Sequence, residues 1–98
     1  MIIHSEYLTG TTVLGSLSVN TKIALMGLVR EILVTPANIT TQYNLTITND
    51  LTLTVFYSSS IIGNFAEEVA LPFRGIYTIT IDSATEEEAF TIGIIAEE

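Results

Sequence analysis

The side chains that could support nucleophilic catalysis are few and lie far apart in the sequence. Three consecutive serines, Ser58–Ser60, offer hydroxyl groups, but a serine nucleophile needs a base within hydrogen-bonding distance and a third group that orients the base. His4 is the only histidine, and it lies close to the N-terminus. We therefore interpret Ser58–Ser60 as a polar segment at the end of a strand, and we predict that the protein is not an enzyme.

Acidic side chains form a second candidate site, in the segment from Asp82 to Glu88. Two carboxylates about 5–10 Å apart can hydrolyse a glycosidic bond, and Asp82 together with Glu86, Glu87 or Glu88 could supply oxygen ligands to Ca²⁺. However, the chain has no tryptophan for a sugar-binding platform, and the spacing differs from that of a calcium-binding helix–loop–helix hand. We interpret the segment as a solvated acidic loop and predict no cofactor, with bound Ca²⁺ and a carboxylate hydrolase left as alternatives.

The overall charge argues against further classes of partner. The 98 residues include 11 acidic and 3 basic side chains, which gives a net charge of −8. A nucleic-acid-binding protein needs a basic stripe that neutralises phosphates, and an anionic membrane likewise attracts basic segments, so we predict neither partner. The absence of cysteine excludes disulfides, thiolate metal sites and cysteine nucleophiles. The first residues lack the basic start and apolar run of a secretory signal, which predicts synthesis in the cytoplasm.

Alternating apolar and polar residues predict that β-strands position these side chains. Residues 43–47 and 51–57 alternate on either side of a central turn, and residues 76–82 and 90–94 alternate on either side of the acidic loop. Two alternating runs joined by a polar connection are typical of a β-hairpin. The sequence therefore predicts two hairpins.

The remaining segments lead to an all-β interpretation. A short strand over residues 69–71 is expected to end at Pro72, because proline cannot donate to a sheet ladder. Residues 22–34 fit either a helical face or one or two buried strands, and an internal glycine favours strands. The seven or eight short strands that result, spaced by roughly ten residues, are typical of an antiparallel β-sandwich, jelly-roll or immunoglobulin-like, with a small closed barrel as the second choice. Residues 1–20 would form an extended N-terminal arm or edge strand, and residues 21–98 the sandwich domain.

Apolar residues on both faces of several strands predict self-association. The alternation places Tyr43, Tyr57 and Tyr77 in the core, whereas Phe56 lies on the polar side of its strand. The neighbouring pairs that suggest two apolar faces are Val29 with Ile32, Val55 with Phe56, and Ile94 with Ile95. Monomers rarely expose large apolar patches, and lysines that could protect sheet edges are scarce, so we expect a homo-oligomer, either a trimer or a dimer. The candidate interface residues are Tyr7, Val13, Leu14, Leu17, Phe56 and Ile95.

The pattern from Gly27-Leu28-Val29 through Ile39 to Ile95 resembles small β-sandwich proteins of tailed-bacteriophage virions. The resemblance rests on an Ile/Val strand that ends at Thr35-Pro36, the hairpin of Tyr43–Ile47, the run Leu71–Ile79 and a final Phe90-Thr91-Ile92 strand. It implies a structural role in the virion, as a capsid decoration, head-fibre or tail component bound to capsid or tail proteins. The alternative is a glycan- or protein-binding β-sandwich module of a larger surface assembly.

Overall fold

The computed structural model describes residues 3–21 and 25–97, and every regular element in these ranges is a β-strand. The predicted all-β fold is therefore confirmed, with eight strands. Their bounds are β1 (Ile3–Thr11), β2 (Leu17–Asn20), β3 (Leu25–Pro36), β4 (Gln42–Thr48), β5 (Thr54–Ile62), β6 (Phe65–Gly75), β7 (Thr78–Asp82) and β8 (Ala89–Glu97).

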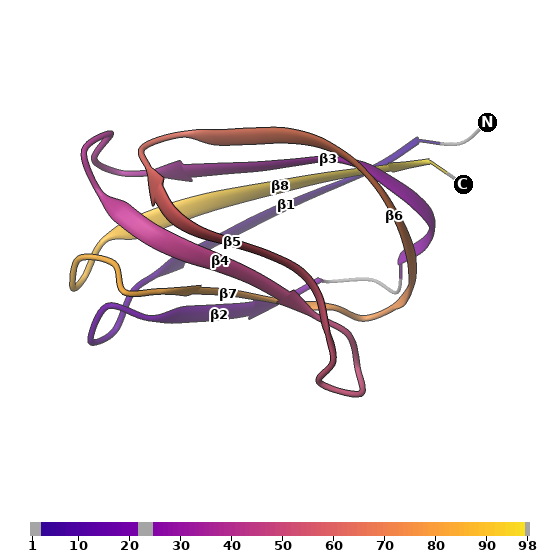
Figure 1. Cartoon of the computed structure of the whole chain (residues 1–98), viewed down its shortest axis with the longest axis horizontal. Coiled ribbons are helices and arrows are strands. Elements are labelled where there is room, and N and C mark those ends of the chain that lie inside the picture. The colour runs from indigo at the N-terminus through magenta and orange to yellow at the C-terminus, as the bar shows by residue number, and fades with distance from the viewer. Residues whose placement is uncertain (1–2, 22–24, 98) are drawn as a thin grey trace.

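The strands form two antiparallel four-stranded sheets that face each other as a sandwich (Figure 1). The first sheet has the order β1-β8-β3-β6, and the second has the order β2-β7-β4-β5. Each strand pairs with the one that occupies the same rank from the other end of the chain: β1 with β8, β2 with β7, β3 with β6 and β4 with β5. The first predicted hairpin is therefore formed by β4 and β5, whereas the second was wrong, because β7 and β8 lie in different sheets. A long hairpin wrapped into two sheets in this way is a jelly roll, so the jelly-roll form is the one of the two expected sandwiches that the chain adopts.

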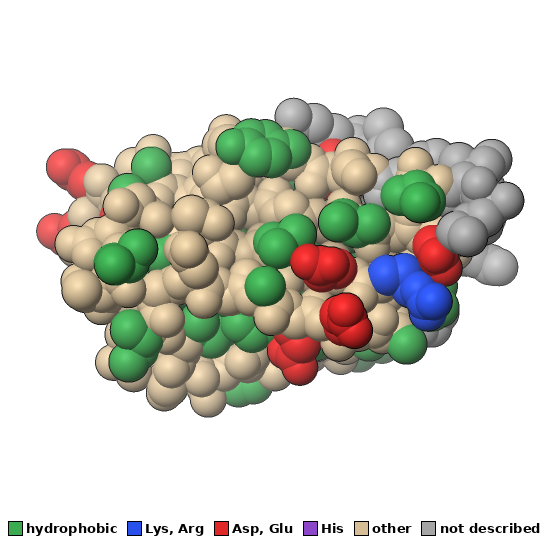
Figure 2. All heavy atoms as spheres, turned by 90° about the horizontal axis from the view of Figure 1, so that it is seen from above, with side chains coloured by type: hydrophobic (Ala, Val, Ile, Leu, Met, Phe, Trp, Pro, Cys, Tyr) green, Lys and Arg blue, Asp and Glu red, His purple; other side chains and the backbone are tan. Residues whose placement is uncertain are grey.

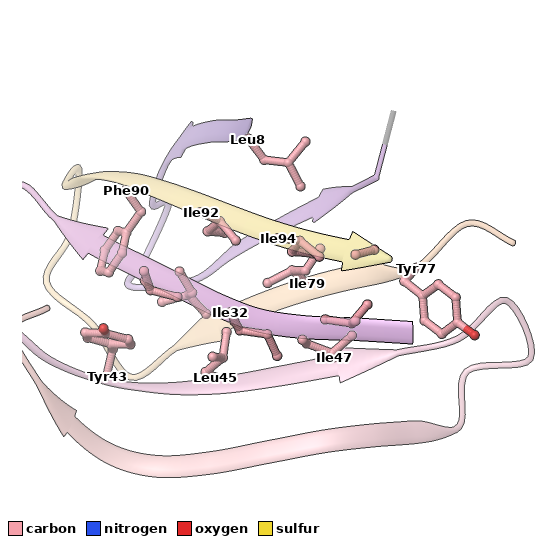
Figure 3. Close-up of a cluster of buried hydrophobic side chains, with 14 residues drawn as sticks. Leu8, Ile32, Tyr43, Leu45, Ile47, Tyr77, Ile79, Phe90, Ile92 and Ile94 are labelled. Atoms are coloured by element: carbon pink, nitrogen blue, oxygen red, sulfur yellow. The ribbon is translucent and has the colours of Figure 1, made fainter. Parts of the chain in front are cut away.

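The core lies between the two sheets and consists mainly of β-branched side chains (Figure 3). Inward residues alternate regularly along β4, β7 and β8, as the sequence predicts, and each is nearly or completely buried. Burying one such side chain stabilises a fold by roughly 1.5–3 kcal/mol. Tyr43 and Phe90 close one end of the core with their rings edge to face, 5.2 Å apart between centroids.

Strand β5 departs from the predicted alternation because its pairing with β4 slips twice. The register shifts between Ile47 and Thr48 and again between Tyr43 and Leu45, and each extra residue reverses the faces that follow. Phe56 therefore points inward, opposite Ile47, and packs against the core, whereas Tyr57 is 58% exposed. The sequence-based placement of Phe56 on the outer face and of Tyr57 in the core was wrong.

Strand β3 contains a similar irregularity, between Val29 and Glu31, in its pairing with both β6 and β8. The bulge turns Val29 and Ile32 toward the same side, and both are fully buried. The expectation that this pair lies on two faces was therefore wrong. The preference for a strand over a helix in this region is confirmed from Leu25 onward; residues 22–24 lie outside the described residues.

The strand expected over residues 69–71 is longer than predicted, because β6 runs through Pro72 to Gly75. β6 lies at an edge of the first sheet, where a proline is tolerated, since only one side of the strand has to donate to a neighbour. The prediction that Pro72 ends the strand was wrong for this reason.

Residues 3–11 and 17–20 form edge strands of the sandwich. β1 pairs with β8 along its whole length, from Ile3 opposite Glu97 to Thr11 opposite Ala89. β2 pairs with β7 at the edge of the second sheet. The backbone of this segment therefore lies in sheets of its own chain.

Candidate functional site

The residues considered for catalysis are not assembled into a catalytic group. Ser59 and Ser60 are exposed on edge strand β5, and the backbone N–H of Ser60 donates to Asn44 Oδ1 at 2.9 Å. Asn44 in turn donates through Nδ2 to Asp82 Oδ1, also at 2.9 Å. These contacts stabilise β5 at its register shift between Tyr43 and Leu45. No described contact joins the serine hydroxyl groups to a side chain that could act as a catalytic base. The side chain of His4 lies outside the described residues.

The acidic loop between β7 and β8 is not one solvated segment, because Glu88 is buried while Glu86 and Glu87 are exposed. The Thr41 hydroxyl donates to both carboxylate oxygens of Glu88, at 2.6 and 2.8 Å, and the backbone N–H of Asn38 donates at 3.0 Å. Within the described ranges, no three His, Asp or Glu side chains are grouped so that they could hold a metal ion. Glu88 therefore acts as a structural acceptor.

Three connections meet at Glu88, and we call them the loop end: residues 12–16 between β1 and β2, residues 37–41 between β3 and β4, and residues 83–88 between β7 and β8. The Thr12 hydroxyl accepts from the backbone N–H of Glu88 at 2.9 Å and donates to the carbonyl of Thr85 at 2.6 Å. The connections lie together at the left of Figure 1. Hydrogen bonds thus join the three connections of the loop end through Glu88.

The most exposed part of the loop end is the tight turn Val13–Ser16. Val13 and Ser16 exchange two backbone hydrogen bonds, at 2.8 and 3.1 Å, and the two central residues, Leu14 and Gly15, have φ values of +53° and +80°. Positive φ at both positions is the signature of a type I′ turn, in which asparagine followed by glycine is preferred. Leucine in the left-handed region costs roughly 1–2 kcal/mol.

Contacts with the loop of residues 83–88 impose the conformation of the Val13–Ser16 turn. The backbone N–H of Ala84 donates to the Gly15 carbonyl at 3.0 Å, and a Cβ atom at Gly15 would lie 2.7 Å from the Ala84 carbonyl oxygen. Leu14 is 84% exposed and Val13 is 71% exposed. A strained leucine whose side chain contacts so little of its own protein has no evident structural role.

Apolar and acidic side chains lie together at the loop end. Ile39 in the connection between β3 and β4 is 71% exposed, and Glu86 and Glu87 are exposed in the connection between β7 and β8. Acidic side chains project from this end at the left of Figure 2, whereas the face seen in that view carries separate apolar side chains. Ile39 was not among the predicted interface residues, and no sequence pattern marks it.

The six predicted interface residues fall into three groups. Val13 and Leu14 lie at the loop end. Tyr7 is 65% exposed on β1, and Ile95 is half-buried on the outer face of the first sheet. Leu17 and Phe56 are half-buried against the core, so these two also contribute to the fold of their own chain. A role in an interface stays a prediction for all six residues.

A shallow hollow of about 320 Å³ lies beside the β3 bulge and is lined by Arg30, Glu31, Glu68 and Val69. Arg30 Nε lies 3.1 Å from Glu97 Oε2 in an ion pair whose side chains are 50% and 30% exposed. This arrangement is a solvated charge pair and does not form an apolar ligand pocket.

No helix in the described part of the chain is long and apolar enough to cross a membrane.

No protein-family model and no curated protein sequence matches the chain. The fold is similar to that of PliG from Aeromonas hydrophila, a periplasmic inhibitor of g-type lysozyme, with a TM-score of 0.57 and 15% sequence identity over 94% of this chain and 86% of that one. It is also similar to the Yersinia pseudotuberculosis-derived mitogen YPM, with a TM-score of 0.52 and 12% identity over 99% of this chain and 89% of that one. These likenesses show a shared β-sandwich fold.

Proposed function

We propose that this chain is a non-enzymatic module that binds another protein through its loop end. The observation that carries the proposal is Leu14, which combines a positive φ of 53° with 84% exposure. Strain of this kind persists at binding sites because it holds a side chain ready for a partner. A leucine that projects from a rigid turn can enter an apolar pocket with little loss of conformational freedom.

The chemistry of the loop end indicates the kind of partner. Val13 and Leu14 supply an apolar anchor, and Glu86 and Glu87 lie in the adjoining loop. The whole chain carries a net charge of −8. The complementary surface is an apolar pocket with lysine or arginine residues around it, and long-range attraction would accelerate the encounter.

Protein binding is favoured over glycan binding by the placement of the aromatic rings. A glycan platform needs two or three exposed rings in a row, and the exposed large aromatic residues among those described are Tyr7 and Tyr57. Tyr7 belongs to the first sheet and Tyr57 to the second. They do not form one platform.

The two similar structures support the proposal by analogy of fold alone. One is named as an inhibitor of a lysozyme and the other as a mitogen. A g-type lysozyme is therefore the first defined partner to titrate. The virion role implied by the sequence resemblance stays a prediction; it is a special case of protein binding, with a capsid or tail protein as the partner.

The proposal is tested by photo-crosslinking from the loop end. Benzoylphenylalanine replaces Val13, and the protein is irradiated in an extract of its native cells or with purified g-type lysozyme. A control carries the same group at Leu51, which is 72% exposed in the connection between β4 and β5, at the opposite end of the sandwich. We expect an adduct from position 13 that is lost in a Leu14→Asn background and weakened by salt.

Two results would contradict protein binding at this site. One is equal labelling from positions 13 and 51, which would indicate non-specific contact. The other is an adduct that is insensitive to Leu14→Asn, because this change removes the anchor while leaving a residue suited to the same backbone conformation.

A further inference from the structure

The sandwich has four edge strands: β1 and β6 in the first sheet, and β2 and β5 in the second. An edge strand presents unpaired N–H and C=O groups to any strand that approaches, and natural proteins protect such edges with bulges, prolines, charges or short strands. Comparing the four edges shows which of them carries this protection.

Three of the edges are protected. β6 contains Pro72 together with Glu67 and Glu68. β5 is broken by two register shifts, and its residue Ser60 has a φ of +56°. β2 is four residues long. Each of these features weakens the template that a regular strand would offer to another chain.

The fourth edge, β1, has the least of this protection. It is nine residues long, and its register with β8 is unbroken. It contains no proline, lysine or arginine, and its single carboxylate, Glu6, is 7% exposed. The Thr12 N–H donates to the Glu88 carbonyl, so by the alternation of the ladder the backbone groups of Ile3, Ser5, Tyr7 and Thr9 point toward the open edge.

We propose that two copies of the chain pair through β1, antiparallel about a twofold axis, so that the two first sheets form one sheet of eight strands. A twofold contact requires only the same surface on both copies, and β1 offers to itself the antiparallel ladder that it already makes with β8. The side chains on its outer face are short or apolar, and the two large ones, Ile3 and Tyr7, are 62% and 65% exposed.

Side-chain chemistry restricts the register of the pair. A register centred on Glu6 would place two like charges opposite each other, which is unfavourable. Centring on Ser5 places Ile3 of each copy opposite Tyr7 of the other, and centring on Tyr7 stacks the two rings. In both registers, the residues that face each other are ones whose backbone N–H and C=O groups point toward the open edge.

The charge of −8 on each chain opposes pairing. At physiological ionic strength the Debye length is about 8 Å, so most of this repulsion is screened. The proposed dimer should consequently be stabilised by added salt, whereas the binding of a basic partner at the loop end should be weakened by it. The two interfaces can be separated on this basis.

Light scattering at tens of micromolar protein tests the dimer. We expect a mass of about 21 kDa, twice the 10.7 kDa of the chain, and a mass near 10.7 kDa after Ser5→Pro. Proline at this position removes an N–H that points toward the open edge and leaves the ladder to β8 intact. Tyr7→Lys provides a second variant in case proline prevents folding, and it should also give the monomer mass. Leu14→Asn should leave the dimer mass unchanged, because Leu14 lies outside β1.

Disulfide trapping tests which strand is paired, since the chain has no cysteine of its own. Ser5→Cys or Tyr7→Cys should form a covalent dimer under mild oxidation, because facing Cα atoms in an antiparallel ladder lie within disulfide range. Ser59→Cys on edge strand β5 is the matched control. A monomer or trimer mass for the unmodified protein, or trapping that is no faster at positions 5 and 7 than at 59, would overturn the proposal.

Discussion

Thr41 and Glu88, 47 positions apart in the sequence, are joined by a buried contact in which the threonine hydroxyl donates to both carboxylate oxygens, at 2.6 and 2.8 Å. The same carboxylate accepts from the backbone of Asn38, so one side chain fixes the connection between β3 and β4 to the start of β8. The loop end depends on this contact for its shape.

Glu88→Ala should lower the free energy of unfolding by roughly 1–3 kcal/mol, because the buried Thr41 hydroxyl and the Asn38 N–H lose their acceptor. In a domain of this size, 1 kcal/mol corresponds to about 4–8 °C in Tm. Glu87→Ala, at the exposed neighbouring position, provides a partial control; because Glu87 has a φ of +52°, Glu87→Gln is the cleaner one and should change stability by less than about 0.5 kcal/mol. Equal effects at positions 87 and 88 would contradict the assigned role of Glu88.

Leu14→Asn should raise stability by about 1 kcal/mol, because asparagine tolerates the left-handed conformation that the type I′ turn requires. Thermal unfolding followed by circular dichroism measures the change. Leu51→Asn is the control, since Leu51 is similarly exposed and its φ is not positive. A lower Tm for Leu14→Asn would show that the leucine supports the fold and is not held there for a partner.

Tyr43 should make the protein less stable at alkaline pH. Burial raises the pKa of Tyr43 from 10.0 to about 12, so the folded state keeps the phenol proton that the unfolded state loses near pH 10. The stabilising contribution of the Tyr43 phenol to the free energy of unfolding is complete below pH 10, and it is lost as the pH rises toward 12. Tyr43→Phe should remove part of this alkaline loss, as seen in Tm values measured between pH 9 and 12.

The same variant should lower stability at neutral pH by about 0.5–1.5 kcal/mol, because the Tyr43 hydroxyl donates to the Gly63 carbonyl at 2.8 Å. Tyr57→Phe is the matched control, since Tyr57 is exposed. Identical pH profiles for Tyr43→Phe and the unmodified protein would contradict the role given to burial.

Chelator should leave Tm unchanged. Asp82 is engaged by Asn44, and Glu88 by Thr41 and Asn38, so the two carboxylates do not converge on a common point. Differential scanning calorimetry with and without EDTA measures this. A fall of several degrees that Ca²⁺ reverses would show a metal site that these contacts do not reveal.

The regular strands could be predicted from the sequence, whereas the bulged ones could not. β4, β7 and β8 alternate strictly, and the sequence-based placement of Tyr43 in the core was correct. The alternation rule fails wherever one extra residue enters a strand, as beside Phe56 and after Val29. Pairing partners and local backbone angles create these bulges, and neither is visible in a polar–apolar pattern.

The candidate site was predictable only in part. Val13 and Leu14 could be proposed as interface residues because they are apolar residues in a segment that glycines interrupt. The strain at Leu14 could not be predicted, since a Leu-Gly pair lacks the usual sequence signal of a type I′ turn. Glu88 was grouped with the exposed glutamates before it, because burial by three converging loops depends on contacts between residues far apart in the chain.

The pairing of Ile3 with Glu97 joins the two ends of the described chain in one ladder, and this has a kinetic consequence. Before β8 exists, β1 has no partner strand, and β3 has only one of its two neighbours. Folding dominated by such distant pairings takes milliseconds to seconds, and a growing chain cannot complete the first sheet on the ribosome until β8 has emerged. Chains that stall before residue 89 should therefore be rapidly degraded, because no shorter part of this sequence can close the first sheet.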